Sequence, residues 1–84
     1  MTNEERTKMT GYEYILAHPN GSLSELDEID SHLADYFASA GIIAFGINSR
    51  ANRRYQVTPV GKKIAEIELI SLKLKMLKER HVAA

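Results

Sequence analysis

The first third of the chain carries apolar residues at steps of three and four, the spacing that places side chains on one face of an α-helix. Tyr12, Ile15 and Leu16 follow this spacing. The next four residues, His-Pro-Asn-Gly at 18–21, combine residue types that end helices and form turns. The pattern therefore predicts a first helix over residues 3–17.

A second helical segment is predicted over residues 22–40. Ser22 and Glu25 have the spacing of a capping box, in which each side chain accepts a backbone N–H at the start of a helix. Gly41 supplies the residue that ends many helices. Asp30 is suited to cap a helix in mid-segment, so we expect two short helices, with one bent helix as the alternative. The apolar residues of this segment are Leu23, Leu26, Ile29, Leu33, Tyr36, Phe37 and Ala40.

Two runs of β-branched and aromatic residues predict two strands, residues 42–47 and residues 53–57. The polar residues between them are suited to a hairpin connection. In the second strand Tyr55 and Val57 alternate with a polar residue, so we expect them to share the buried face. Thr58 then places an N-cap hydroxyl before a proline at the first helical position, which predicts a long helix over residues 59–81.

This last helix is apolar on two opposite sides. One row consists of Val60, Ile64, Ile67, Leu74 and Leu77, and the other of Ala65, Leu69, Leu72 and Met76. The rows are displaced by two residues, which is roughly 200° around a helix. One small domain does not cover both sides, so we expect a homodimer that uses Leu69, Leu72 and Met76. The alternative is that the first helix covers this second row.

Composition restricts the class of protein. The 84 residues are 44% hydrophobic and 26% charged, as in an ordinary soluble domain, and they fit one hydrophobic core. No cysteine is present, so we expect no disulfide framework and no thiol chemistry. No apolar run has the length of a membrane span or of a signal peptide, so we expect a single cytoplasmic domain without a membrane partner.

The net charge is zero, but the charges are segregated. Residues 22–49 hold five acidic side chains and no lysine or arginine. Residues 50–84 hold nine of the eleven Lys and Arg side chains and three of the eleven Asp and Glu side chains. We therefore expect an acidic middle and a basic end.

The order of the predicted elements, with Gly-Ile-Ile at 41–43 and RYQVTPVGKKIAE at 54–66, resembles the winged-helix DNA-binding domains of bacterial and archaeal regulators. The resemblance covers residues 22–68. It implies an α+β, mostly α fold, a winged helix-turn-helix whose wing is residues 48–54. It also implies a small transcriptional regulator that binds double-stranded DNA. The chain departs from the family in the short distance between Leu23 and Gly41, which requires a second helix that is very short or fused with the third.

The candidate DNA contacts are basic side chains around the second strand, because contacts to phosphates dominate affinity for DNA. Ser31 and His32 are candidates for base edges, in a predicted recognition helix over residues 31–40. That helix has Asp35 and no lysine or arginine, which favours the alternative of a protein-binding module whose acidic helices contact a basic partner. The alternative is that these cations have a structural role. They lie on a solvated hairpin and keep its edge strand from pairing with other chains. The basic candidates are Arg50, Arg53, Arg54, Lys62 and Lys63.

No pattern in the chain predicts catalysis or a cofactor. His18, His32 and His81 lie in different predicted elements and lack the spacing of metal ligands. The acidic cluster around Asp27 lacks the alternating spacing of a calcium loop. No glycine-rich phosphate-binding motif is present either, so we expect a protein that is not an enzyme and has no metal.

Overall fold

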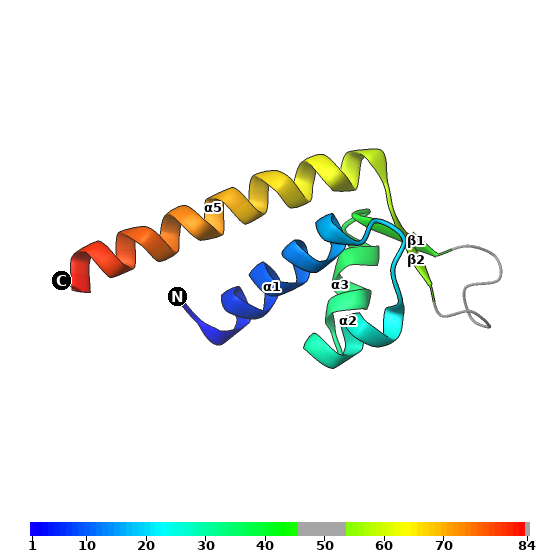
Figure 1. Ribbon diagram of the computed structural model, residues 1–84, viewed down its shortest axis with the longest axis horizontal. Coiled ribbons are helices and arrows are strands. Elements are labelled where there is room, and N and C mark those ends of the chain that lie inside the picture. Colours follow the sequence, from blue (N-terminus) through cyan, green and yellow to red (C-terminus); the bar gives the residue numbers. More distant parts are fainter. Residues whose placement is uncertain (46–53, 84) are drawn as a thin grey trace.

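The computed structural model describes residues 1–45 and 54–83, and these residues are mostly helical, with a small antiparallel sheet (Figure 1). The strand and helix predictions therefore hold in type and order. The predicted helix at 3–17 has the same bounds as α1, and the long last helix begins at Pro59 as predicted and extends two residues further. The elements are α1 (Asn3–Ala17), α2 (Leu23–Ile29), α3 (Leu33–Ser39), β1 (Ile43–Phe45), β2 (Tyr55–Val57) and α5 (Pro59–Ala83).

The sheet consists of β1 and β2, which pair antiparallel with Ile43 opposite Val57 and Phe45 opposite Tyr55. An isolated antiparallel bridge joins Ser22 to Arg54, so the segment between α1 and α2 runs beside the start of β2. The hairpin prediction is confirmed for the strands. The predicted wing, residues 48–54, lies outside the described residues except for Arg54.

The core lies where α1, α2, α3, the sheet and the first turns of α5 meet. Tyr12 and Phe37 stack with their ring centroids 5.1 Å apart. Tyr55 is buried, Gln56 is exposed and Val57 is half-buried, so Tyr55 and Val57 share the inner face as predicted. The buried apolar side chains are Tyr12, Ile15, Leu26, Leu33, Ala34, Phe37, Ile42, Ile43, Tyr55 and Ala65.

The segment 22–40 forms two helices, as expected, but its caps differ from the prediction. Ser22 accepts from the backbone N–H of Ser24, while the Glu25 carboxylate accepts the Tyr14 hydroxyl instead of reaching back to the backbone. The capping box predicted at Ser22 is therefore wrong in its second half, because a tertiary partner competes for Glu25. A complete capping box occurs instead between Thr2 and Glu5.

The turn between α2 and α3 is organised by Asp30. Its carboxylate accepts from the backbone N–H of His32 at 2.8 Å, and its carbonyl accepts from the N–H of Leu33 at 3.2 Å. The N-cap position of α3 is His32, whose side chain makes no capping bond. Asp30 thus shapes the turn rather than capping α3 as predicted.

The junction of β2 and α5 is fixed by Thr58. The Thr58 hydroxyl accepts from the N–H of Gly61 at 2.8 Å, which is the predicted cap, and also donates to the carbonyl of Gly41 at 2.7 Å. Gly41 has φ 75°, the left-handed conformation that glycine adopts most easily. At Gly61 a Cβ atom would collide with the carbonyl of Ile42, so only glycine lets α5 approach β1 this closely.

From this junction α5 runs antiparallel beside α1 (Figure 1). Leu69 and Leu72 are half-buried and pack against the core, and Met76 is half-buried beside Met9 of α1. The alternative stated above is thus correct, since α1 covers the row that was predicted to form the dimer. The opposite row is left uncovered except for Ile64, which is half-buried and packs against the core. The uncovered row also includes Ile70, which the sequence pattern had not assigned to it.

Candidate nucleic-acid interface

The predicted DNA-contacting cations of the described residues lie at both ends of β2. Arg54 precedes the strand, and Lys62 and Lys63 lie in the first turns of α5, all three with exposed side chains. An extended chain rises about 3.3 Å per residue, so Arg54 lies roughly 15 Å from the start of α5. The cations therefore form an open band and not a compact cluster. Arg50 and Arg53 lie outside the described residues.

Arg54 is held in place by the segment that follows α1. One Nη atom of Arg54 donates to the carbonyl of Asn20 at 2.8 Å. An arginine has five N–H donors in a planar fork, so this single bond leaves donors that face solvent and can bind an anion. The bond also restricts the rotamers of the side chain, which lowers the entropy cost of holding a phosphate.

The edge of β2 that does not pair with β1 is held by hydrogen bonds to the turn after α1. The backbone N–H of Tyr55 donates to the carbonyl of Gly21 at 3.1 Å, and that of Val57 donates to Pro19 at 2.8 Å. The Tyr55 hydroxyl donates to the carbonyl of His18 at 2.7 Å, and burial raises the pKa of this phenol above its ordinary value. The turn after α1 thus pairs with β2 and fixes the strand that separates Arg54 from Lys62 and Lys63.

The exposed side of α3 presents a different chemistry. Ser31 and His32 are exposed at its start, as a contact to base edges requires, but the exposed side chains along the helix include Asp35 and Tyr36 and no cation. A duplex repels a carboxylate, so this side contributes little to phosphate binding.

A cation that the sequence pattern did not single out lies beside α3. The ammonium of Lys8, on α1, lies 4.5 Å from the centroid of the Tyr36 ring, in a cation–π contact. Lys8 also lies 3.6 Å from the carboxylate of Glu4. Lys8, His32 and Tyr36 line one cavity of about 380 Å³ between α1 and the start of α3. Only the packing of α1 on α3 brings Lys8 there, and no spacing in the sequence indicates it.

One of the acidic side chains in the middle of the chain makes a hydrogen bond between helices. Glu25 accepts the Tyr14 hydroxyl, and burial together with this bond raises the pKa of Tyr14. Glu28 on α2 and Asp35 on α3 are exposed. Glu25 is exposed as well, so α2 and α3 both present carboxylates to solvent.

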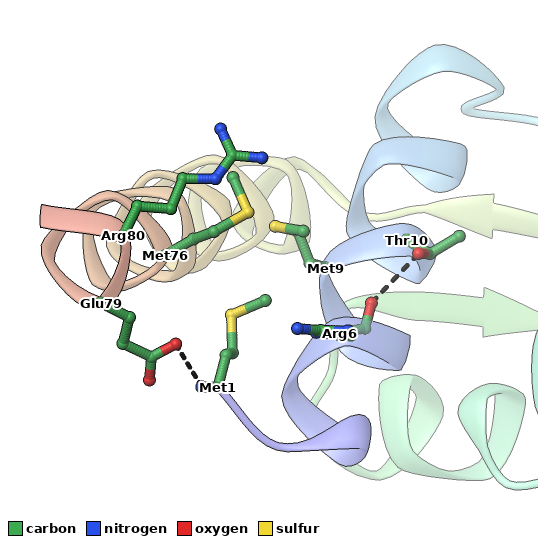
Figure 2. Close-up of a pocket in the computed structure, with 7 residues that line it drawn as sticks. All are labelled: Met1, Arg6, Met9, Thr10, Met76, Glu79 and Arg80. Carbon is green, nitrogen blue, oxygen red and sulfur yellow. Dashed lines mark hydrogen bonds and ion pairs between the residues drawn. The ribbon is translucent and has the colours of Figure 1, made fainter. Parts of the chain in front are cut away.

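A larger cavity, of about 560 Å³, lies far from the cationic band, between the N-terminal half of α1 and the C-terminal half of α5 (Figure 2). Met9 and Met76 meet across it, and the Met1 amino group pairs with Glu79 at its edge. Arg6 and Arg80 lie on its exposed rim. The Lys75 ammonium donates to the carboxylate of Glu5 at 2.6 Å and links the same two helices. These contacts tie α5 to α1.

Within residues 1–45 and 54–83, no group of His, Asp and Glu side chains is arranged to hold a metal ion. No helix in the same ranges is long and apolar enough to cross a membrane.

Comparison of the chain with protein-family models, with curated proteins and with solved structures found no significant match.

Proposed function

We propose that this chain is a winged helix-turn-helix protein that binds double-stranded DNA and acts as a small transcriptional regulator. The observation that carries the proposal is the order and pairing of its elements. Three helices precede an antiparallel hairpin, the Ser22 segment pairs at the edge of β2, and β2 leads directly into a helix whose first turns carry exposed Lys62 and Lys63. In this proposal the wing is the segment 48–54 predicted from the sequence, between β1 and β2.

In this proposal the cationic band supplies most of the affinity. Arg54, Lys62 and Lys63 contact phosphates, and Arg50 and Arg53 add charge from the wing. Ser31 and His32 at the start of α3 face base edges. Because Asp35 opposes deep entry of α3 into the groove, binding depends on charge more than on sequence, and its affinity falls steeply with salt.

A second candidate function is a protein-binding module. The observation that favours it is the exposed surface of α2 and α3, which carries Glu28 and Asp35 and no lysine or arginine. Such a surface complements a basic protein partner. In this alternative the fold is the same and the cations keep the hairpin edge from pairing with other chains.

A mobility-shift titration against random duplex at about 50 mM and 200 mM salt separates the two functions. We expect Lys62→Ala with Lys63→Ala to weaken DNA binding about tenfold and to lower the salt slope by roughly two, one for each lost phosphate contact. The matched control is Lys73→Ala with Lys78→Ala, which removes two exposed cations from the far part of the same helix and is expected to bind as the parent does.

A stronger test changes Arg50, Arg53 and Arg54 together to alanine, with an expected loss of tenfold or more at moderate salt. If the parent protein binds no duplex, or if this triple variant binds as well as the parent, the DNA proposal is wrong. The protein-binding alternative is then tested by comparing the parent with a variant that carries Glu28→Lys and Asp35→Lys in the capture of basic proteins.

A further inference from the structure

One face of α5 carries a row of large apolar side chains that the rest of the described chain leaves in solvent. Ile67 is 66% exposed, Ile70 59%, Leu74 53% and Leu77 55%. Isolated exposed apolar residues are common, but four in one row form a continuous strip. Their steps are three, four and three, which are the a and d positions of a heptad repeat.

The strip lies on the opposite side of α5 from α1. At 100° per residue its four members are centred about 150° from Leu69, Leu72 and Met76, which contact α1 and the core. Packing α5 on α1 thus leaves the strip uncovered and gives it the straight, narrow shape of a coiled-coil seam.

We propose that a second copy of this chain packs on the strip, with the two α5 helices antiparallel. The register is centred near residue 72, so that Ile67 faces the partner's Leu77 and Ile70 faces the partner's Leu74. Every apolar member of the strip then meets an apolar member of the same strip. Such a contact is isologous, with the same patch used by both subunits, and it closes as a dimer.

Charge complementarity decides the direction. In the antiparallel register Glu66, exposed beside the strip, faces the partner's Arg80 at both ends of the seam, and one like pair, Lys73 with the partner's Lys73, lies at the centre. A parallel pair instead places Lys73 near the partner's Lys78 twice. It also places Lys63, which occupies a d position, opposite its own copy in the seam.

The size of the strip sets the strength of the association. At their exposed fractions the four side chains offer on the order of 400 Å² of apolar surface per subunit. A standard interface buries about 800 Å² per partner, so the flanking side chains must supply the rest and the dimer is at the small end of specific interfaces. We therefore expect dissociation in the micromolar range.

Sedimentation equilibrium from about 1 to 100 μM tests the dimer, with the measured mass rising from 9.4 kDa towards twice that value. Ile70→Glu with Leu74→Glu places four carboxylates in the centre of the seam, and we expect this variant to stay at 9.4 kDa throughout. Both side chains are exposed in one chain, so the helical signal in circular dichroism should be retained.

Val60→Glu is the matched control. Val60 is 65% exposed and lies in line with the strip, but in the antiparallel register it lies beyond the end of the seam. We expect Val60→Glu to dimerise like the parent. In a parallel pair Val60 would face its own copy, and the same change would weaken the dimer.

Cysteine crosslinking tests the direction independently, because the natural chain has no cysteine. We expect Ile70→Cys and Leu74→Cys chains to form a disulfide-linked dimer when they are mixed under mild oxidation, and much less of it when each is oxidised alone. Efficient crosslinking of Ile70→Cys with itself would overturn the antiparallel direction. A parent chain that remains at 9.4 kDa at 100 μM would overturn the dimer itself and leave the strip to a different partner.

Discussion

The two ends of α5 belong to regions that are held together in different ways. Its first turns join the head, which we define as the core with α2, α3 and the sheet, where Ala65 is fully buried with Phe37 and Leu26. Its later turns form the arm, residues 66–80, where the side chains are half-buried or exposed. The head buries its apolar side chains within its own core, whereas the arm is covered by α1 on one side only.

The arm therefore depends on weaker contacts. Lys75 pairs with Glu5 at the surface, and the amino group of Met1, whose side chain is almost fully buried, pairs with the partly exposed Glu79. Exposed ion pairs typically contribute less than about 1 kcal/mol each, because water and salt screen them. The free energy of folding is therefore concentrated in the head, whereas the arm has the exposed apolar surface that a partner can cover.

The largest expected effect contrasts one side chain from each region. Phe37→Ala removes a fully buried ring that stacks on Tyr12, and we expect it to lower the free energy of unfolding by about 3–5 kcal/mol. Leu74→Ala, on the exposed strip of the arm, should change it by less than about 0.5 kcal/mol in the monomer.

Urea unfolding followed by circular dichroism at about 1 μM measures both variants, and the low concentration keeps the proposed dimer dissociated. Equal losses in the two variants would contradict the distinction between head and arm.

An intermediate effect is expected at the junction of the two regions. Thr58→Ala removes the cap of α5 and the hydroxyl bond to the carbonyl of Gly41, and we expect a loss of about 1–2 kcal/mol in thermal or urea unfolding. Thr58→Ser keeps the hydroxyl and is the matched control, with most of the stability retained. A serine variant as unstable as the alanine variant would show that the methyl group, and not the hydrogen bonds, matters.

The smallest expected effect is a pH dependence in the arm. The bond from Lys75, with the contact to Thr2 next in size, lowers the pKa of Glu5 from 4.5 to about 2. A lowered pKa in the folded state stabilises the protein above the unfolded value, and this contribution is lost as the pH falls from about 4.5 to about 2.

The melting temperature of Lys75→Met should therefore be lower than that of the parent near neutral pH. This difference should shrink towards pH 2 and in high salt. Lys73→Met, at another exposed position of the arm, is the control for loss of one cation, and all three proteins are compared at about 1 μM, where the proposed dimer is dissociated. A difference that stays constant with pH would assign the effect of Lys75 to its aliphatic stem and not to its charge.

Local signals in the sequence were sufficient for most of the secondary structure. Apolar spacing located α1, and the Thr58-Pro59 pair located the start of α5, because caps and periodicity act over a few residues. The same reasoning misassigned Glu25, which bonds Tyr14 across the helix interface. A side chain with two possible partners is decided by packing, which short-range spacing does not contain.

Only part of the candidate interface could be predicted from the sequence. Clustering of basic residues identified Arg54, Lys62 and Lys63, and their exposure agrees with that expectation. The bond from Arg54 to Asn20 and the placement of Lys8 over Tyr36 depend on segments brought together by the fold. No periodicity within one helix indicates such contacts.

The two faces of α5 mark the boundary between what the sequence determined and what the tertiary structure decided. The apolar spacing alone predicts a helix that is apolar on opposite sides, because the positions around a helix follow from its pitch. It did not determine which side α1 covers, since either row is apolar enough to be buried. The close approach at Gly61 and the cap at Thr58 fix how α5 leaves the sheet. That orientation turns Leu69 and Leu72 towards the core and leaves Ile67, Ile70, Leu74 and Leu77 in solvent.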